Sequence, residues 1–478
     1  MNKNVFSDLA EKFDTILKDD ARIETYREDT MFRGDPDAVI RARDETDVRA
    51  AMKYCFVSKI PMTFCGSRTS MTGASIPTEG VVISTERLEG IIDIGEHQGR
   101  KTITTRTGTI TAAVQKAAEE AGFYFPVAPT SRDDCRIGAN VATNATGEDS
   151  FKYGPIRAYT RRLKIWLADG TEKILERAAS EKPSWDRNRA GYVLDWKNPI
   201  DLFVGSEGTL GFIAEVTLDL LDRVPHYFSA LAPFPTNRKA LEFIVATAQS
   251  TDLKPRALEL VDASALDVMR THTTFPRLPE AAKAMVYFKQ EYQDEADRDQ
   301  WLGRWFSVLE KASTPDLVTA VLIADTQKDR ENFRLWRHHI PSTVNERARK
   351  FWDAGGGKVG SDWWVPIPKL LEMMDFFYTH ADALGLPYMA YAHVGSGHPH
   401  TNIICANASE LKKADELLLT CCRKAVALGG GVAGEHGVGK IHRNLLSIQH
   451  PLSAVAKMRR WKEEYDPLFL LGRGNIFD

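Results

Sequence analysis

The sequence predicts an α+β fold, with short strands, turns and helices in the first half and longer helices beside an antiparallel sheet in the second. Two observations predict it. Short apolar runs and Gly-rich turns follow one another as far as Leu221. Beyond that point Pro225, Pro233 and Pro235 punctuate the chain, and the apolar stripes become long enough for helices. This change of pattern predicts the entry to a second domain.

Two helices can be placed from apolar stripes. Residues 46–57 should form one helix, with Thr46 as its cap and Val48, Ala51, Met52, Cys55 and Phe56 on one face. Residues 411–428 should form another, which Gly429 ends. The stripe of this second helix consists of Leu411, Ala414, Leu418, Cys421, Cys422, Ala425 and Leu428.

Short strands are expected at residues 61–65, 81–84, 163–167 and 171–175. The last two should form a hairpin, because apolar and polar positions alternate in the third strand and Asp169-Gly170 is a common turn pair. The final segment, from Tyr465 to Asp478, is rich in turn formers. We expect it to pack back onto an earlier domain.

Length and composition are those of an ordinary globular protein. The 478 residues suffice for two or three domains, and 43% hydrophobic with 27% charged residues is typical of a soluble chain. The net charge of -3 gives no basis for binding nucleic acid or an anionic membrane. We find no transmembrane run and no signal peptide. The six cysteines contain no CxxC pair, so we expect reduced, mostly buried thiols in a cytoplasmic protein without an iron–sulfur centre.

Three Gly-rich stretches can hold backbone close to a ligand. Gly66 to Gly73 follows a strand and offers N–H and hydroxyl groups that can cradle a pyrophosphate, with Arg68 adding charge, although a surface turn has a similar sequence. Ile137 to Gly147 has small side chains that suit either a flat ring or a tightly packed helix. Phe203 to Ile213 contains three glycines between apolar runs, which predicts a strained turn feeding a strand.

Histidines gather at two Gly-flanked sites. His393-Val394-Gly395-Ser396-Gly397-His398-Pro399-His400 holds three imidazoles, and Gly434-Glu435-His436-Gly437 sets a carboxylate beside a fourth. Two or three His with one Glu is a plausible set for a divalent metal. Ordinary loop histidines are the alternative, but four of the 12 histidines fall in these two stretches.

Together these motifs resemble the FAD-linked D-2-hydroxy-acid dehydrogenases of the vanillyl-alcohol oxidase superfamily, the family of D-lactate and D-2-hydroxyglutarate dehydrogenases and the glycolate oxidase flavin subunit. The similarity runs from about Thr46 to the C-terminus. It rests on five ordered motifs: residues 66–77, 137–154, 205–211, 393–400 and 435–439. The resemblance implies a two-part FAD-binding domain, residues 1–222 and 431–478, and an α+β substrate (cap) domain on an antiparallel sheet, residues 223–430.

The resemblance also implies roles for individual residues. His393, His400 and Glu435 would bind the metal, for which we expect zinc, with manganese and iron as alternatives. His436 would be the catalytic base. Arg337 would grip the substrate carboxylate, although a surface ion pair is equally compatible with the sequence. The residues that would contact FAD are Gly66, Ser67, Arg68, Thr69, Ser70, Gly73, Pro129, Asp134, Ile137, Gly138, Thr143, Asn144, Gly147 and Ile213.

The chain departs from the family at several of these sites. Ser396, His398 and Pro399 stand where relatives have Asp, Asn and Leu. His398 could therefore serve as a third metal ligand, a substrate contact or a second base. Gly360 stands where dicarboxylate-handling relatives keep a Lys, which puts a clamp for a distal carboxylate in doubt. Trp363-Trp364 suits either an apolar substrate pocket or the core.

The implied activity is oxidation of a D-lactate-like 2-hydroxy acid, with an apolar or aromatic side chain as an option, by hydride transfer to flavin N5. A cytochrome, a quinone, an electron-transferring flavoprotein or oxygen would reoxidise the flavin, and the electron acceptor could bring the protein to a membrane surface. A homodimer is common among relatives. Alternatives are an aromatic or phenolic alcohol oxidoreductase of the same superfamily, an ether-forming relative, and a non-catalytic subunit that binds metal or flavin.

Overall fold

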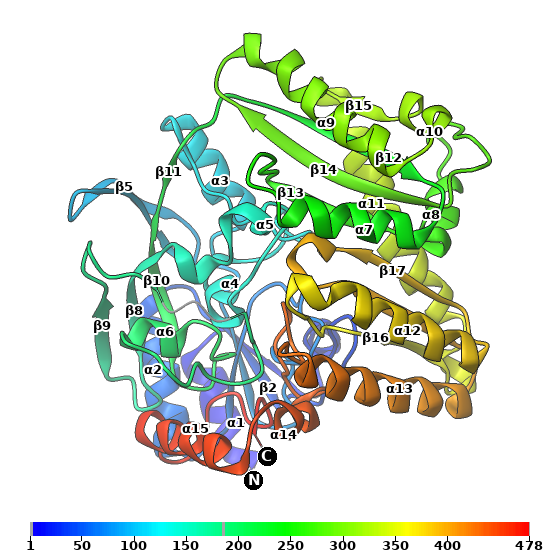
Figure 1. Cartoon of the computed structure of the whole chain (residues 1–478). Coiled ribbons are helices and arrows are strands. Elements are labelled where there is room, and N and C mark those ends of the chain that lie inside the picture. The colour runs from blue at the N-terminus through cyan, green and yellow to red at the C-terminus, as the bar shows by residue number, and fades with distance from the viewer. Residues whose placement is uncertain (1–2, 184–186, 478) are drawn as a thin grey trace. The chain divides into compact units, whose positions relative to one another are not determined.

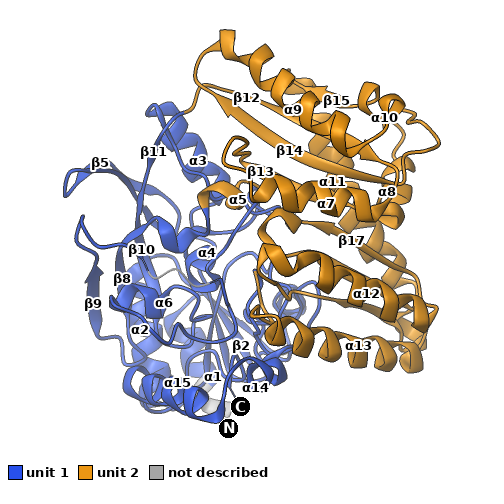
Figure 2. Cartoon of the chain, viewed as in Figure 1, with its two compact units in different colours: residues 1–147, 154–223, 435–478 blue, residues 148–153, 224–434 orange. Residues whose placement is uncertain are grey.

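The computed structural model describes residues 3–183 and 187–477, and most of its helices and many of its strands are labelled in Figure 1. The chain divides into two compact units (Figure 2). Unit 1 consists of Met1–Gly147, Gly154–Arg223 and Glu435–Asp478, and unit 2 of Glu148–Tyr153 and Val224–Gly434. The short segment Glu148–Tyr153 therefore belongs to unit 2, although the sequence on either side of it belongs to unit 1.

Unit 1 contains a four-stranded sheet in the order β1-β2-β4-β3. Strands β2 (Ala38–Arg41), β4 (Val81–Ser84) and β3 (Met62–Cys65) are parallel, and β1 (Thr15–Leu17) pairs with β2 in the antiparallel sense. Residues 81–84 form a strand as predicted, and the predicted strand at 61–65 begins one residue later. These strands are buried on both faces, as parallel strands usually are.

A second sheet of unit 1 is antiparallel and five-stranded, in the order β5-β6-β10-β8-β9. It comprises β5 (Ile91–His97), β6 (Arg100–Arg106), β10 (Phe212–Asp219), β8 (Thr160–Trp166) and β9 (Glu172–Glu176). The predicted hairpin is confirmed, because β8 and β9 pair around the turn at Asp169-Gly170. A small ribbon joins β7 (Phe123–Tyr124) to β11 (Leu221–Asp222).

The helices of unit 1 are α1 (Lys3–Lys12), α2 (Glu45–Val57), α3 (Thr111–Glu120), α4 (Ile137–Thr143), α6 (Pro199–Phe203), α14 (Leu446–Gln449) and α15 (Leu452–Tyr465). The predicted helix at 46–57 exists, but Thr46 as its cap is wrong. The side chain of Asp44 accepts from the backbone N–H of Asp47 and begins the helix two residues earlier. Both Asp and Thr are good caps, and the carboxylate also complements the helix dipole.

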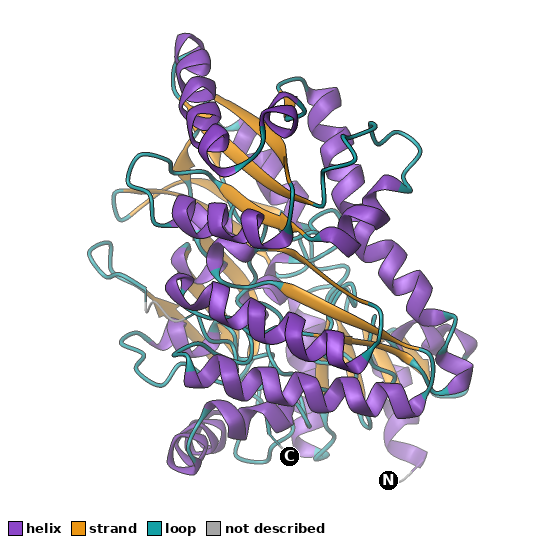
Figure 3. Cartoon of the chain, turned by 45° about the vertical axis from the view of Figure 1, so that its right-hand side comes forward, coloured by secondary structure: helices purple, strands orange, loops and turns teal. Residues whose placement is uncertain are grey.

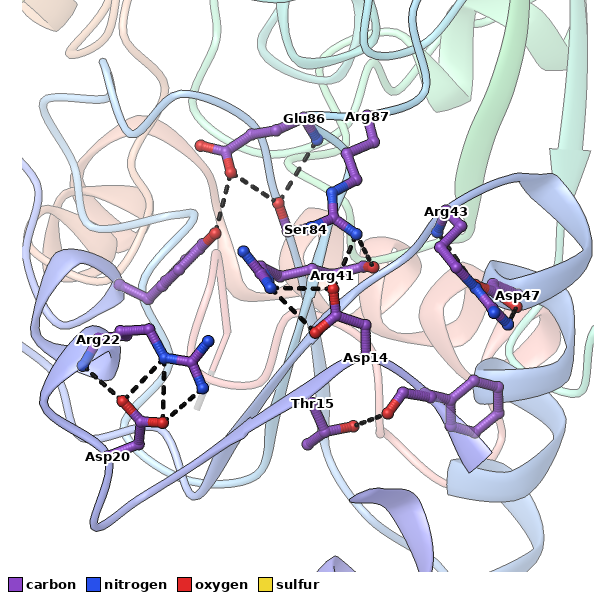
Figure 4. A network of polar contacts seen from close by, with 12 residues as sticks. Asp14, Thr15, Asp20, Arg22, Arg41, Arg43, Asp47, Ser84, Glu86 and Arg87 are labelled. Atoms are coloured by element: carbon purple, nitrogen blue, oxygen red, sulfur yellow. Dashed lines mark hydrogen bonds and ion pairs between the residues drawn. The ribbon is translucent and has the colours of Figure 1, made fainter. Parts of the chain in front are cut away.

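Polar contacts gather near the last residues of β2 and β4 (Figure 4). Asp14 binds Arg41 at 2.9 Å and Arg87 at 2.8 Å, while Ser84, the last residue of β4, donates to Glu86 at 3.1 Å. Asp14 and both arginines are partly exposed, so each such pair is worth only about 0–1 kcal/mol.

Unit 2 is built on a seven-stranded antiparallel sheet in the order β15-β12-β14-β13-β17-β18-β16. The antiparallel sheet expected for the second half of the chain is therefore present. The strands are β12 (His226–Phe234), β13 (Ala257–Val261), β14 (Ala284–Tyr292), β15 (Leu322–Ala324), β16 (Gly357–Gly360), β17 (Tyr388–Ala392) and β18 (His400–Cys405).

Long helices flank this sheet (Figure 3). Helices α8 (Ala263–Arg270) and α11 (Gln327–Arg349) pack on the face that carries Ala257 and Tyr287. The opposite face meets α9 (Arg298–Ala312), where Trp305 stacks on Phe288 with ring centres 3.8 Å apart. The other helices are α5 (Ser150–Tyr153), α7 (Asn237–Ala248), α10 (Pro315–Thr319), α12 (Leu370–Leu384) and α13 (Ala408–Ala427).

Helix α13 corresponds to the stripe predicted at 411–428, and Asn407 caps it by accepting from the N–H of Glu410. All six cysteines are free and buried, as expected. No described helix has an apolar stretch long enough to cross a membrane.

Candidate active site

The histidine loop of unit 2 joins the end of β17 to the start of β18. Ala392, at the end of β17, has a φ of 72°, a left-handed conformation that is costly for a residue with a Cβ and that turns His393 out of the strand. Gly395 passes so close to β13 that an added Cβ would lie 2.6 Å from Cβ of Leu258. The glycine between Val394 and Ser396 is therefore required by packing.

Three imidazoles meet in this loop. The ring centres of His393 and His400 are 5.6 Å apart, and those of His398 and His400 are 4.8 Å apart. His398 is 6% exposed, and its Nε2 lies 3.0 Å from Oδ1 of Asp362. One ligand atom each from Asp362, His398 and His400 lie within 4.8 Å of one another. Imidazole nitrogen and carboxylate oxygen are the donors that zinc prefers, so the chemistry of this cluster fits a divalent cation.

Asp362 also holds the chain just before Glu435. The N–H of Gly434 points to the backbone oxygen of Asp362 at 2.7 Å and to its Oδ2 at 3.1 Å. A Cβ at Gly434 would lie 2.8 Å from the ring of His398. Gly434 is the last residue of unit 2, and Glu435 and His436 open the final segment of unit 1. Their roles as metal ligand and base stay predictions.

Arg337 lies on α11, with its guanidinium 4.2 Å from the centre of the Tyr287 ring. It is not at the surface: its side chain is 15% exposed and has two carboxylate partners. Nη1 is 3.1 Å from Oε1 of Glu148, and both Nε, at 3.0 Å, and Nη2 donate to Oε2 of Glu259. The surface ion pair considered from the sequence is therefore replaced by a largely buried one, and any substrate carboxylate would meet Arg337 already paired.

These charges stabilise one another. Burial alone would raise the pKa of the Glu259 carboxyl, but the charge of Arg337 and the contact with His393 outweigh it and lower the pKa. The pKa of Glu148 is likewise lowered, because Arg337 and Lys289 outweigh burial. Burial would lower the pKa of Arg337, yet Glu148 and Glu259 raise it. The two acids are thus ionised and Arg337 is charged, as expected of a buried network in which each member has partners.

In unit 1, the loop that follows β3 presents unpaired backbone donors. Among the described residues, none of the five N–H groups from Gly66 to Ser70 has a hydrogen-bond acceptor. Arg68 has a φ of 59°, which turns the chain sharply inside this run. Successive free N–H groups in a turn form a concave anion site, so the loop fits a pyrophosphate.

The Arg68 side chain points into an ion pair. Its Nη1 donates to Oε1 of Glu86 at 2.9 Å, and its guanidinium lies 4.7 Å from the Tyr26 ring centre. Arg136 stabilises the loop, because its Nε donates to Oγ of Ser67 at 3.0 Å. The negative charge of a phosphate would therefore be balanced by the backbone N–H groups first, because Arg68 is already paired with Glu86.

The small-residue stretch 137–147 forms helix α4 and its cap. An added Cβ on Gly138 would lie 1.8 Å from Oγ1 of Thr107, so the glycine is required by tight helix packing, one of the two alternatives for this stretch. Asn144 ends α4 in a left-handed conformation with a φ of 52°. Its Oδ1 accepts from the N–H of Arg157 at 3.2 Å. Contacts of this stretch with flavin stay predictions.

The other predicted flavin contacts also lie in unit 1. Pro129 is partly exposed and Asp134 exposed before α4, and the Oγ1 of Thr143 donates to the backbone oxygen of Ala139 at 3.0 Å. A Cβ on Gly147 would lie 2.2 Å from the backbone oxygen of Ala128. Ile213 pairs with Ile165 in the five-stranded sheet.

The stretch 203–213 forms the strained turn that was predicted. Gly205 has a φ of 84°, Glu207 of 53° and Gly208 of 71°, and β10 begins at Phe212. Glu207 is 5% exposed, and its carboxylate accepts from the backbone N–H groups of Val438 and Gly439. The segment that carries His436 is therefore attached to this turn within unit 1.

Sequence reasoning missed four acids: Glu207, Glu259 and Asp362, which are buried, and Glu148, which is half-buried. The sequence does contain a signal for Glu259, because this acid interrupts the apolar strand Ala257-Leu258-Glu259-Leu260-Val261. A charge at the centre of such a strand requires a buried partner. Which residue supplies the partner could not be read from the strand.

The chain matches two family models that together define a two-domain flavoprotein. The family model described as "FAD binding domain" matches residues 36–176, and "FAD linked oxidases, C-terminal domain" matches residues 225–476, more than half of the chain. The protein belongs to the FAD-linked oxidases. It is an FAD-linked oxidoreductase, and the family expected from the sequence is confirmed.

Relatives match over nearly their whole length. "Glycolate oxidase subunit GlcD" of Bacillus subtilis is 27% identical, covering 95% of this chain and 92% of the relative. "D-lactate dehydrogenase" of Archaeoglobus fulgidus is 27% identical, covering 92% of this chain and 90% of the relative. The solved structure of a 4-ethylphenol oxidase from Gulosibacter chungangensis has a TM-score of 0.72 at 15% identity, covering 99% of this chain and 96% of that one. That likeness confirms the fold expected from the sequence.

Proposed function

We propose that this flavoprotein oxidises a D-lactate-like 2-hydroxy acid, with an apolar or aromatic side chain as an option, to the 2-oxo acid. The observation that carries the proposal is the cluster of His393, His398 and His400 beside the buried Asp362, in a chain of the FAD-linked oxidases. Relatives named for glycolate and D-lactate support the substrate class. When bound, FAD accepts the hydride of the α-carbon, and a divalent cation acidifies the substrate hydroxyl.

The residues of this chain are proposed to bind the cation, the substrate and FAD and to take up the hydroxyl proton. His393, His400 and Glu435 hold the cation, for which we propose zinc, with manganese or iron as alternatives. His436 takes the hydroxyl proton, since imidazole titrates near neutral pH. Arg337 holds the substrate carboxylate through its Nη1 edge and so orients the C–H bond. The free N–H groups of residues 66–70 bind the FAD pyrophosphate.

His398 is proposed as a substrate contact. Its Nε2 is held by Asp362 at 3.0 Å, and its ring lies against Gly434, which precedes Glu435. A cytochrome, a quinone or an electron-transferring flavoprotein is proposed to reoxidise the flavin.

The test is an anaerobic panel of D- and L-hydroxy acids, aromatic ones included, scored by loss of flavin absorbance. The expected result is bleaching by at least one D-hydroxy acid in the wild type and its loss in His436→Ala, which should keep the yellow colour. His97→Ala is the matched control, because His97 is a partly exposed histidine of unit 1 that hydrogen-bonds Glu176 at 2.8 Å. Undiminished bleaching in His436→Ala would remove His436 as the base.

Metal analysis separates the proposal from the alternative of an aromatic or phenolic alcohol oxidoreductase. The phenolic alternative needs no metal. Purified protein that is active on phenols and inactive on every hydroxy acid after zinc loading would establish the alternative.

A further inference from the structure

Glu259 places a charge at the centre of an apolar strand. It lies in β13 between Leu258 and Leu260 and is 3% exposed. Its side chain points to the sheet face that α11 covers, where Tyr287 of β14 is its direct cross-strand neighbour. An ionised carboxylate in such a position is strongly destabilising unless it is well paired. The two oxygens of Glu259 have different partners.

Oε1 faces a histidine. It lies 3.0 Å from Nδ1 of His393. A carboxylate beside Nδ1 favours the tautomer that carries its proton on that nitrogen, and in that tautomer Nε2 is the nitrogen that can ligate a cation. Carboxylates in this place also fix the ring plane and raise the basicity of the ligating nitrogen.

Oε2 faces the arginine of α11. It accepts from both Nε, at 3.0 Å, and Nη2 of Arg337. These two bonds fix the guanidinium plane over the Tyr287 ring. They leave the Nη1 edge, 3.1 Å from Glu148, as the edge at which an incoming carboxylate must compete.

We propose that Glu259 is a positioning residue that sets the cation-binding nitrogen of His393 and the carboxylate-binding edge of Arg337 together. The inference rests on the proposed function, because both roles belong to it. The Glu259 carboxylate contacts both His393 and Arg337. A single substitution of Glu259 should therefore weaken both cation binding and substrate binding. A carboxylate that only offsets a buried arginine would affect stability and leave the affinity for a cation unchanged.

The experiment measures two quantities on the full-length, FAD-loaded protein. The first is the affinity for zinc alone, by competition with a chromophoric chelator after metal removal. The second is KM for the most active hydroxy acid at saturating zinc. In Glu259→Gln the amide offers one acceptor where two are needed. We expect zinc affinity to fall about 10- to 100-fold and KM to rise in the same variant.

Two further variants separate the roles. Arg337→Lys should raise KM while zinc affinity stays at the wild-type value. Glu291→Gln is the matched control, since Glu291 is a buried acid of the adjacent strand β14 that pairs with Arg256 at 3.3 Å and accepts from the hydroxyl of Tyr153 at 2.6 Å. It should change neither quantity.

Glu259→Asp covers the case in which the Gln variant does not fold. It keeps the negative charge beside Arg337 but is shorter by one methylene, so it cannot reach both partners. Retained flavin absorbance reports folding. A folded Gln or Asp variant with wild-type zinc affinity overturns the inference alone, while a wild-type protein that takes up no zinc overturns both the inference and the proposed function.

Discussion

The Oε2 atom of Glu207 lies 2.7 Å from the backbone nitrogen of Gly439, which donates to it. Oε1 accepts from the N–H of Val438 at 3.0 Å. A Cβ on Gly437 would lie 2.5 Å from the same carboxylate, so the glycine lets the chain approach. These contacts attach the segment that follows His436 to the strained turn at residues 205–208.

The same segment also meets the loop predicted to bind pyrophosphate. The N–H of Lys440 donates to the backbone oxygen of Thr72 at 2.9 Å, and its Nζ donates to Oδ1 of Asn475 at 2.6 Å. The amide of Asn475 in turn donates to the backbone oxygen of Glu207 at 3.1 Å. Burial lowers the pKa of Lys440 to about 8. Loop, turn and final segment therefore form one polar cluster in unit 1.

Glu207→Gln should change the pH dependence of stability. Burial raises the pKa of the Glu207 carboxyl from 4.5 to about 7, so the folded protein holds this proton more tightly than the unfolded chain. Protonated Glu207 therefore makes its full contribution to the free energy of unfolding below pH 4.5. This contribution, about 3 kcal/mol, is lost as the pH rises to 7. Thermal unfolding midpoints over this range should fall more steeply in the wild type than in the variant.

Asp262 provides the internal control for that comparison. Burial raises its pKa to about 7 as well, and it is present in both proteins, so its contribution cancels. Identical pH slopes in wild type and Glu207→Gln would contradict the prediction.

Glu148→Gln should tighten the binding of a non-oxidisable carboxylate such as oxamate. Glu148 competes for Nη1 of Arg337 at 3.1 Å, and removing its charge frees that edge. We expect a gain of about 1 kcal/mol, or about fivefold in Kd, measured by perturbation of the flavin spectrum. Glu291→Gln should leave the Kd unchanged. Weaker binding in Glu148→Gln would mean that Arg337 does not receive the carboxylate.

Removal of the metal should separate turnover from flavin binding. The imidazole cluster lies in unit 2, whereas the free N–H groups of residues 66–70 lie in unit 1. Dialysis against a chelator is therefore expected to abolish bleaching by hydroxy acid while the flavin absorbance remains, and added zinc should restore bleaching. Full bleaching after complete metal removal would contradict a role for the cation.

Gly138→Ala should destabilise unit 1 and lower its FAD content. The added methyl would lie 1.8 Å from Oγ1 of the buried Thr107, so α4 has to move away. Overpacking of this kind costs about 1–3 kcal/mol. Gly303→Ala in α9 is the matched control, because nothing lies within 4 Å of its added Cβ. The measurements are the thermal midpoint and the ratio of flavin to protein absorbance, and equal values in both variants would refute the packing argument.

Local patterns in the sequence determined the α+β class, the strand at 81–84, the hairpin around Asp169-Gly170 and the helix that Gly429 ends. They also picked out the Gly-rich loops and the histidine cluster, because these features depend on residues that are near one another in the chain. The cap of α2 was misplaced, since Thr46 and Asp44 are both good caps and only the folded backbone selects between them.

Tertiary structure alone decided the partners of the buried acids. Neither the bridge from Glu259 to His393 and Arg337, nor the place of Glu148–Tyr153 in unit 2, follows from any local pattern. The physical reason is that an isolated strand shows that a charge must be paired, but not with which residue. That choice is made when α11 docks on the sheet and brings side chains from distant segments into the same low-dielectric space.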